Sequence, residues 1–180
     1  MTLILASASP QRSAILEQLG VEFTVKPTGI DEIDKGEPRD LVIENALRKA
    51  RAVEDRPVLG ADTAVVIDGI VYGKPRDSQQ ARRYLERLAG RKHHVWSGIA
   101  YIGEDGEERT SAAVTHVTFR ALSPAELEWY LGTGEWRERA GAYAVQGRGS
   151  ALVERIEGDF WNVVGLPVPE LIKLVPDLLG

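Results

Sequence analysis

The sequence contains no cysteine, and no unbroken apolar run in its 180 residues is longer than four residues. Without cysteine the chain can form no disulfide, no thiolate nucleophile and no cysteine-ligated metal site, which leaves oxygen ligands and hard cations as the available metal chemistry. A helix that spans a membrane needs about 20 apolar residues, so we expect no membrane partner. The opening MTLILASASP also lacks the cationic leader and long apolar segment of a signal peptide. These absences predict a cytoplasmic protein.

An excess of positive charge is also missing. The 22 Lys and Arg residues are outnumbered by 27 Asp and Glu residues, which gives a formal net charge of −5. Long nucleic acids are bound by extended basic faces, so we expect no partner of that kind. Only 6 of the basic residues are Lys, and we therefore consider each lysine individually as a candidate functional residue.

The composition and the pattern of the chain predict one α/β domain that spans residues 1–180. With 43% hydrophobic and 27% charged residues, the chain resembles an ordinary folded protein. Helical patterns alternate with isolated strands and with hairpins, which favours a mixed β-sheet with flanking helices. We expect strands at 2–6, 22–26, 57–62, 64–67, 70–72, 93–102, 110–122 and 151–156, and helices at 10–19, 39–54, 78–88, 124–131 and 168–179.

The segment Ser7-Ala8-Ser9-Pro10-Gln11-Arg12 lies at a strand-to-helix junction. Ser9 suits an N-cap and Pro10 the first helical position. Free backbone N–H groups, two hydroxyls and a guanidinium at a helix start favour an anion. A capped helix with a surface arginine explains the same residues, and from spacing alone we favour it slightly.

Two carboxylates and two lysines are further candidates. Asp62 follows a short apolar strand, where it could bind Mg²⁺ or accept a proton from water, although an Asp that stabilises a turn is as good an explanation. Glu32 lies in an acidic loop that solvation alone can explain. Lys49 and Lys74 could neutralise phosphate, although most lysines are simply solvated.

The segment 158–167, GDFWNVVGLP, combines an aromatic pair, Asn162 and a Gly-Leu-Pro turn. It predicts a shaped loop, either close to a base or sugar or filling the core before the last helix.

The order of these motifs resembles the Maf family of nucleoside triphosphate pyrophosphatases, from residue 5 to residue 171. LASASPQR, Asp-Glu, Lys49, GADT, GKP, AGAYAVQG and GDFWNVVGLP follow one another in this sequence. The resemblance implies an elongated, two-lobed Maf/ITPase-like fold with a central cleft, often paired as a homodimer. It also implies Mg²⁺- or Mn²⁺-dependent cleavage of a nucleoside triphosphate between its α- and β-phosphates, as housecleaning of the nucleotide pool.

The resemblance also implies roles for individual residues. Asp62 would accept the proton of water, and Glu32 and Asp62 would hold the metal. Lys49 and Lys74 would act as catalytic groups on the triphosphate. The residues that would bind the substrate are Ser7, Ser9, Gln11, Arg12, Thr63, Gln146 and Asn162.

Within the family, Thr63 and the segment AGAYAVQG resemble the branch that acts on dTTP and UTP. The amide of Gln146 can both donate to and accept from a uracil-type edge. Gln11 departs from this branch, which usually has arginine there, and is the single feature that favours a 7-methyl-GTP pyrophosphatase. A non-catalytic nucleotide-binding regulator of cell division is a further alternative, but the intact charged residues favour an enzyme.

Overall fold

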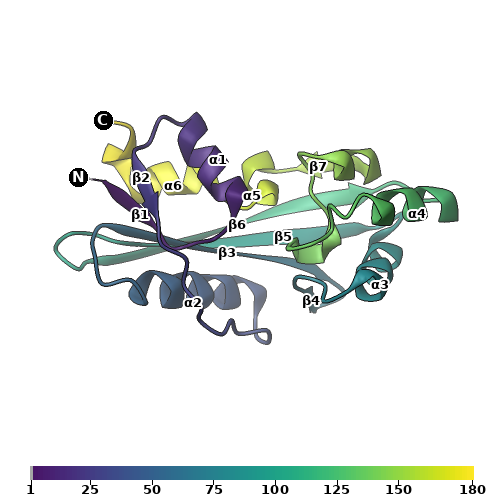
Figure 1. The fold of residues 1–180 in the computed structure, drawn as a ribbon, viewed down its shortest axis with the longest axis horizontal. Coiled ribbons are helices and arrows are strands. Elements are labelled where there is room, and N and C mark those ends of the chain that lie inside the picture. Colours follow the sequence, from purple (N-terminus) through teal and green to yellow (C-terminus); the bar gives the residue numbers. More distant parts are fainter. Residues whose placement is uncertain (1) are drawn as a thin grey trace.

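The computed structural model describes residues 2–180. These residues form a single mixed β-sheet that extends along the length of the molecule (Figure 1). The sheet has seven strands, in the order β2 (Phe23–Val25), β1 (Leu3–Leu5), β3 (Val58–Ile67), β5 (Lys92–Ile102), β6 (Glu108–Phe119) and β7 (Val153–Glu157), with β4 (Ile70–Tyr72) also paired to β3. β1 is parallel to both β2 and β3, and the other pairs are antiparallel. The predicted mixed sheet is therefore confirmed.

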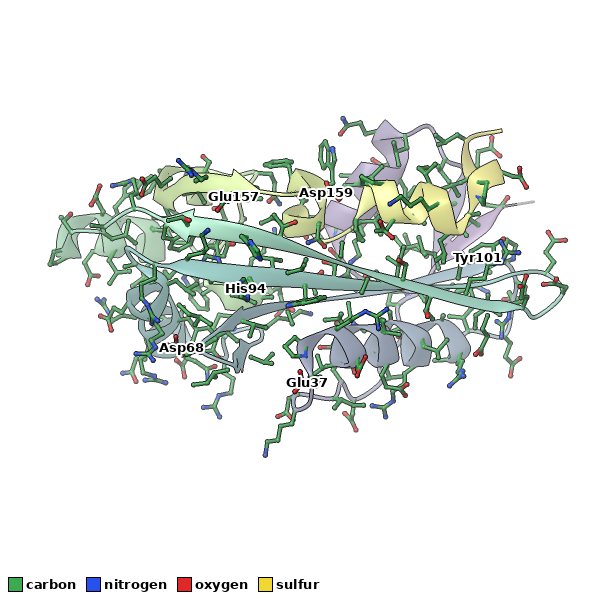
Figure 2. All side chains as sticks on the ribbon, turned by 180° about the vertical axis from the view of Figure 1, so that it is seen from behind. Glu37, Asp68, His94, Tyr101, Glu157 and Asp159 are labelled. Atoms are coloured by element: carbon green, nitrogen blue, oxygen red, sulfur yellow. The ribbon has the colours of Figure 1, made fainter. Side chains whose placement is uncertain are left out.

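Helices cover both faces of this sheet. The helices are α1 (Pro10–Gln18), α2 (Pro38–Arg51), α3 (Ser78–Leu88), α4 (Pro124–Gly132), α5 (Phe160–Val164) and α6 (Val168–Leu174), with 3₁₀ turns η1 (Ala140–Ala142), η2 (Arg148–Leu152) and η3 (Pro176–Leu179). Figure 1 shows α2 on one face and α1, α5 and α6 on the other, and Figure 2 shows the same layers from behind. Within residues 2–180, no helix combines the length and the apolar character needed to cross a bilayer.

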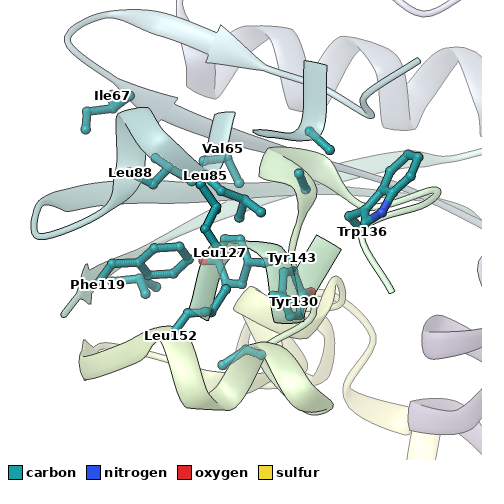
Figure 3. Packing of buried hydrophobic residues seen from close by; sticks show 14 of the residues in the cluster. Val65, Ile67, Leu85, Leu88, Phe119, Leu127, Tyr130, Trp136, Tyr143 and Leu152 are labelled. Atoms are coloured by element: carbon teal, nitrogen blue, oxygen red, sulfur yellow. The ribbon is translucent and has the colours of Figure 1, made fainter. Parts of the chain in front are cut away.

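The apolar core is divided along the sheet, which makes the molecule elongated and two-lobed. At one end, α3, α4 and η1 pack on a cluster that includes Phe119 and Tyr130 (Figure 3). At the other end, Leu16 and Leu171 belong to a second cluster, and Ala50 on α2 belongs to a third. The long strands β3, β5 and β6 connect the two ends (Figure 1).

The structure corrects the predicted course of the chain around Asp62. We expected a short strand ending at this residue and a separate strand at 64–67, but β3 is continuous, because β5 pairs with it from Val58 to Val66. The other edge of β3 is paired with β1 only at Val58 and Leu59, and with β4 only from Val65. Asp62 therefore lies in mid-strand, beside an interval where, within residues 2–180, that edge of β3 has no neighbouring strand.

Three other local predictions have different outcomes. The predicted hairpin turn is confirmed, since Asp68 and Gly69 both have positive φ, 53° and 72°. The predicted loop at 158–167 contains the short helix α5, whose N-cap, Asp159 (labelled in Figure 2), accepts a hydrogen bond from the backbone of Trp161. The last helix, α6, ends at Leu174 rather than at 179, because Pro176 disfavours helical geometry in the residue before it.

Candidate active site

Two glycines bring α2 into close contact with the sheet at Asp62. A Cβ at Gly60 would overlap the backbone oxygen of Ala46, and a Cβ at Gly98 would overlap the backbone of Val42. Side chains alternate between the faces of a strand, so Asp62 lies on the same face as Gly60 and is also paired with Gly98. The close approach of the helix therefore places α2 side chains directly against this carboxylate.

Lys49 on α2 lies between two carboxylates. Its Nζ is 2.7 Å from Oδ1 of Asp62 and 2.6 Å from Oε1 of Glu32. Lys49 and Asp62 are buried, with 8% and 6% of their surface exposed. Two negative groups and one positive group therefore meet at one point, which leaves a net negative charge that a cation or a positive side chain can balance.

Asn45, one helical turn before Lys49, connects the other side of this cluster. Its amide nitrogen donates to Oδ2 of Asp62 at 3.0 Å and to the backbone oxygen of Ile33 at 2.9 Å, and its amide oxygen accepts from the Ile33 backbone at 2.8 Å. Asn45 therefore fixes the loop that carries Glu32. The sequence analysis did not predict a role for Asn45. Asn45 and Lys49 are a polar pair at i, i+4 among the apolar residues of one helix face, and this pattern could have indicated it.

The charge of Glu32 is maintained by its neighbours. Burial acts to raise the pKa of this carboxyl, but Lys49, with Lys74 and Arg12, outweighs burial and holds the pKa below its usual value. Glu32 is therefore ionised at neutral pH and can serve as a ligand for a positive group.

Arg12 lies on the opposite face of β3, where Thr63 points. Its guanidinium donates to the backbone oxygen of Gly165 at 2.9 Å, to Oγ of Ser7 at 2.9 Å and to Oγ1 of Thr63 at 3.2 Å. Burial lowers the pKa of Arg12, while Asp62 and Glu32 act to raise it. These three hydrogen bonds hold the guanidinium in one orientation, and two of its five N–H donors remain for a ligand.

The start of α1 differs in one detail from the expected cap. Pro10 is the first helical residue, as predicted, but the side chain of Ser9 makes no capping hydrogen bond. Instead its hydroxyl donates to the side-chain oxygen of Gln11 at 3.1 Å, and its backbone N–H donates to Oγ of Ser7 at 3.2 Å. Ser9 is therefore the N-cap residue, as predicted, but its side chain bonds to Gln11 instead of to the backbone of the first turn.

A cavity of about 450 Å³ lies at the open edge of β3 and reaches both faces of the strand. Its far wall is formed by residues after β4 and around η1, including Lys74, Glu138, Tyr143 and Gln146. Lys74 is 3.4 Å from Glu138, and both side chains are exposed, so a ligand can replace this contact. Of the predicted site residues, the ones that line the cavity are Ser7, Ser9, Gln11, Arg12, Glu32, Lys49, Asp62, Thr63, Lys74 and Gln146.

Asn162 is the one predicted site residue outside the cavity lining. It is completely buried, and its amide nitrogen donates to the backbone oxygen of Val95 at 3.0 Å and to Oγ1 of Thr115 at 2.9 Å. Its backbone oxygen accepts from Ser97, whose hydroxyl is also 2.8 Å from that of Thr63. Asn162 therefore attaches α5 to the sheet, on the side where Gly165 holds Arg12.

The cavity has too few carboxylate oxygens to hold a hard cation alone, so the phosphates of a bound ligand would have to complete its coordination. Within residues 2–180, no three His, Cys, Asp or Glu side chains are grouped as metal ligands. Glu32 and Asp62 lie close enough to contact the same ammonium of Lys49, and Mg²⁺ is typically held by one or two carboxylates together with substrate phosphates and water. The cavity can thus accommodate a polyphosphate with a divalent cation between two carboxylates and several basic groups.

Comparison with known proteins is consistent across most of the chain. A family model described as Maf-like protein matches residues 2–178. The chain is 47% identical over 178 residues to a dTTP/UTP pyrophosphatase of Anaeromyxobacter dehalogenans (strain 2CP-C), covering 96% of this chain and 92% of that protein. It is 48% identical over 180 residues to a dTTP/UTP pyrophosphatase of Moorella thermoacetica, covering 96% and 93%.

Among solved structures, a HAM1 protein from Coxiella burnetii resembles this chain with a TM-score of 0.50 and 18% identity, covering 84% of this chain and 91% of that one. At that identity the similarity concerns the fold alone.

Proposed function

The chain belongs to the Maf-like protein family, and from this premise we propose that it is a nucleoside triphosphate pyrophosphatase acting on dTTP and UTP. It hydrolyses the anhydride between the α- and β-phosphates and releases a nucleoside monophosphate and pyrophosphate, which clears these nucleotides from the pool. The observation that carries the proposal is Lys49 buried between Glu32 and Asp62, on the wall of a cavity that also contains Arg12 and Lys74.

Asp62 is the group that activates water. Lys49 holds one of its oxygens and Asn45 holds the other, so the carboxylate is fixed in direction within the cavity. As the oxygen of a water molecule bonds to phosphorus, the P–O bond of the anhydride breaks and the proton of the water passes to Asp62. A carboxylate held in place does this without the cost of reorientation in the transition state.

Glu32 and Asp62 are the residues that would hold a Mg²⁺ or Mn²⁺ ion. Both carboxylates accept from the Nζ of Lys49, so a cation would use the oxygen positions that Lys49 leaves free, and such oxygens are the hard ligands that these cations prefer. When bound, the cation would neutralise and polarise phosphate oxygens.

The basic residues of the cavity bind the triphosphate. Arg12 is preoriented by Ser7, Thr63 and Gly165, so its free N–H groups point in a defined direction. Lys74 exchanges its exposed contact with Glu138 for a phosphate oxygen. Charge builds up on the phosphates during attack, and convergent cations stabilise it.

Base choice depends on Thr63, Gln146 and Gln11, which line the same cavity. The Gln146 side chain can pair with the N–H and a carbonyl of uracil or thymine. Gln11 is uncharged and bonded to Ser9, so it contributes hydrogen bonding rather than charge at the start of α1.

A nucleotide panel tests the proposal. Purified protein with Mg²⁺ or Mn²⁺ is incubated with dTTP, UTP, CTP, dATP and 7-methyl-GTP, and pyrophosphate is measured. We expect turnover of dTTP and UTP; turnover of none would overturn the enzymatic function, and turnover of 7-methyl-GTP alone would overturn the branch.

The Asp62→Asn variant provides the matched control for the panel, because it keeps the size of the side chain and removes the base. Its kcat for UTP should fall at least ~100-fold while the thermal unfolding curve stays cooperative. Near-normal turnover in this variant would show that the proton acceptor has been misplaced.

A homodimer, a cytoplasmic location and a single domain over residues 1–180 complete the proposal. They rest on the family resemblance and on the composition of the chain. Light scattering coupled to size-exclusion chromatography would measure the mass in solution, and a monomer of 19.8 kDa at all concentrations would exclude the dimer.

A further inference from the structure

Arg139 lines the cavity without a side-chain partner. Its Nε is buried and has no hydrogen-bond partner within residues 2–180. Burial lowers the pKa of Arg139, while Tyr130, Glu135 and Glu138 act to raise it. A guanidinium that is partly withdrawn from water and not paired is costly unless an acceptor meets it.

The neighbouring carboxylates make their hydrogen bonds and ion pairs with other groups and do not accept from Arg139. The two oxygens of Glu135 accept from the backbone N–H groups of Arg148 and Gly149, at 2.9 and 2.8 Å. The carboxylate of Glu138 lies 3.4 Å from the Nζ of Lys74. These two carboxylates therefore leave the N–H donors of Arg139 available to a ligand in the cavity.

Arg139 belongs to the same stretch of cavity wall as Gln146, since Arg139, Ala144 and Gln146 all line the cavity. Two side chains hold this stretch in place. Glu135 accepts from the backbone of Arg148, just after Gln146, and the hydroxyl of Tyr130 accepts from the backbone of Ala144 at 3.1 Å.

We propose that Arg139 donates a hydrogen bond to a ring carbonyl oxygen of the pyrimidine and so determines the preference for uracil and thymine over cytosine. This inference rests on the proposed function and names a further residue that reads its substrate. Thymine presents a carbonyl acceptor at position 4, as uracil does, where cytosine presents an amino donor. Arginine can only donate, so a cytosine amino group would face a donor and leave both groups unpaired.

Steady-state kinetics with UTP and CTP test this role in the wild type and in Arg139→Ala. We expect kcat/KM for UTP to fall about 10- to 100-fold, mainly through KM, because a charge-assisted hydrogen bond is lost. The value for CTP should change by less than about twofold, so that discrimination decreases. Arg139→Lys, which keeps a donor, should recover part of the preference.

Arg148→Ala is the control. Arg148 is an exposed arginine in the same part of the chain but does not line the cavity, so this variant loses the same charge without changing the cavity wall. It should leave the UTP-to-CTP ratio unchanged. An equal loss for both nucleotides in Arg139→Ala would mean that Arg139 binds phosphate, and no loss would mean that it has no role in binding; either result overturns the inference.

Calorimetric titration with UMP and CMP separates this inference from the proposed function, since it needs no turnover. Preferential binding of UMP that Arg139→Ala abolishes would support Arg139 even in a protein that hydrolyses no nucleotide. Equal binding of UMP and CMP by the wild type would overturn it. Because Arg139 has no side-chain partner, its removal should leave the fold intact, and Arg139→Gln repeats the test if the alanine variant unfolds.

Discussion

At the residue scale, Lys49 allows the buried carboxylate of Asp62 and the more exposed carboxylate of Glu32 to lie close together. It lies within hydrogen-bonding distance of both Glu32 and Asp62, so their mutual repulsion is offset where they converge. Removing one member of such a cluster leaves an uncompensated charge, and the loss is larger than the pair contributes when intact. Lys49 is thus the residue that makes this negative site compatible with folding, in addition to the catalytic role that we propose for it.

His93 gives the clearest pH dependence at this scale. It is buried, its Nε2 is 2.8 Å from the Tyr143 hydroxyl, and burial, with a smaller contribution from His94, lowers its pKa from 6.5 to about 3. The folded protein therefore binds this proton less readily than the unfolded chain. Below pH 6.5 the free energy of unfolding should decrease by about 1.4 kcal/mol per pH unit, until about pH 3.

Urea unfolding of the wild type and of His93→Gln between pH 4 and pH 8 measures this contribution. Other groups affect both proteins alike, so the difference between their slopes reports His93. Equal slopes for the two proteins would contradict the assignment.

At the element scale, β3 and α5 together determine the position of Arg12. β3 carries Asp62 toward α2 and Thr63 toward α1, because neighbouring residues of a strand point to opposite faces. α5 ends at Gly165, whose backbone oxygen accepts from Arg12. The position of Arg12 therefore depends on how α5 is attached to the sheet.

Asn162→Ala tests this dependence. The substitution removes the hydrogen bonds that the Asn162 amide donates to the Val95 oxygen and the Thr115 hydroxyl, so we expect a loss of about 1–3 kcal/mol in the free energy of unfolding. Since Gly165 would no longer be held in place, KM for UTP should rise more than kcat falls.

Ser123→Ala provides the matched control, because it removes the N-cap of α4 and costs a similar 0.5–2 kcal/mol or so, without any contact to Arg12. Its KM should stay at the wild-type value. The same rise of KM in both variants would show that lost stability, and not the attachment of α5, explains the effect.

At the scale of the whole molecule, the net charge of −5 and the binding of a polyanion are compatible. Basic groups from both lobes converge on one cavity, with Arg12 on one wall and Lys74 and Arg139 on the other. A small triphosphate needs only such a local group of charges, whereas a long nucleic acid needs an extended basic face. A ligand in this cavity also connects the two lobes.

Nucleotide binding should therefore stabilise the entire fold. With Mg²⁺ and α,β-methylene-UTP at about 100 times its Kd, the free energy of unfolding should increase by about 2.7 kcal/mol. For a chain of this size we expect Tm to rise by about 5–10 °C, measured by differential scanning fluorimetry. An oligothymidylate at equal phosphate concentration should produce no shift, and a comparable shift would contradict the proposed mode of binding.

Much of the molecule could be predicted from the sequence alone, where the signal is local. The helix 78–88 and the hairpin formed by the strands at 64–67 and 70–72 are predicted from neighbouring residues, and the structure confirms both. The ordered motifs identified the family in the same way, since each is a short stretch with characteristic residue types.

What required the tertiary structure is the meeting of residues that are distant in the chain. The sequence placed Asp62 at a strand end, but the open interval beside it exists because β1 and β4 pair with different parts of one continuous strand. The sequence predicts Asn162 as a substrate-binding residue, whereas its burial and its hydrogen bond to the backbone of Val95 are set by tertiary packing. The guanidinium of Arg139 remains free to bind a ligand because Glu135 and Glu138 bind other groups. Pairing between distant strands and competition for hydrogen bonds are properties of the folded chain, and no local pattern of residues specifies them.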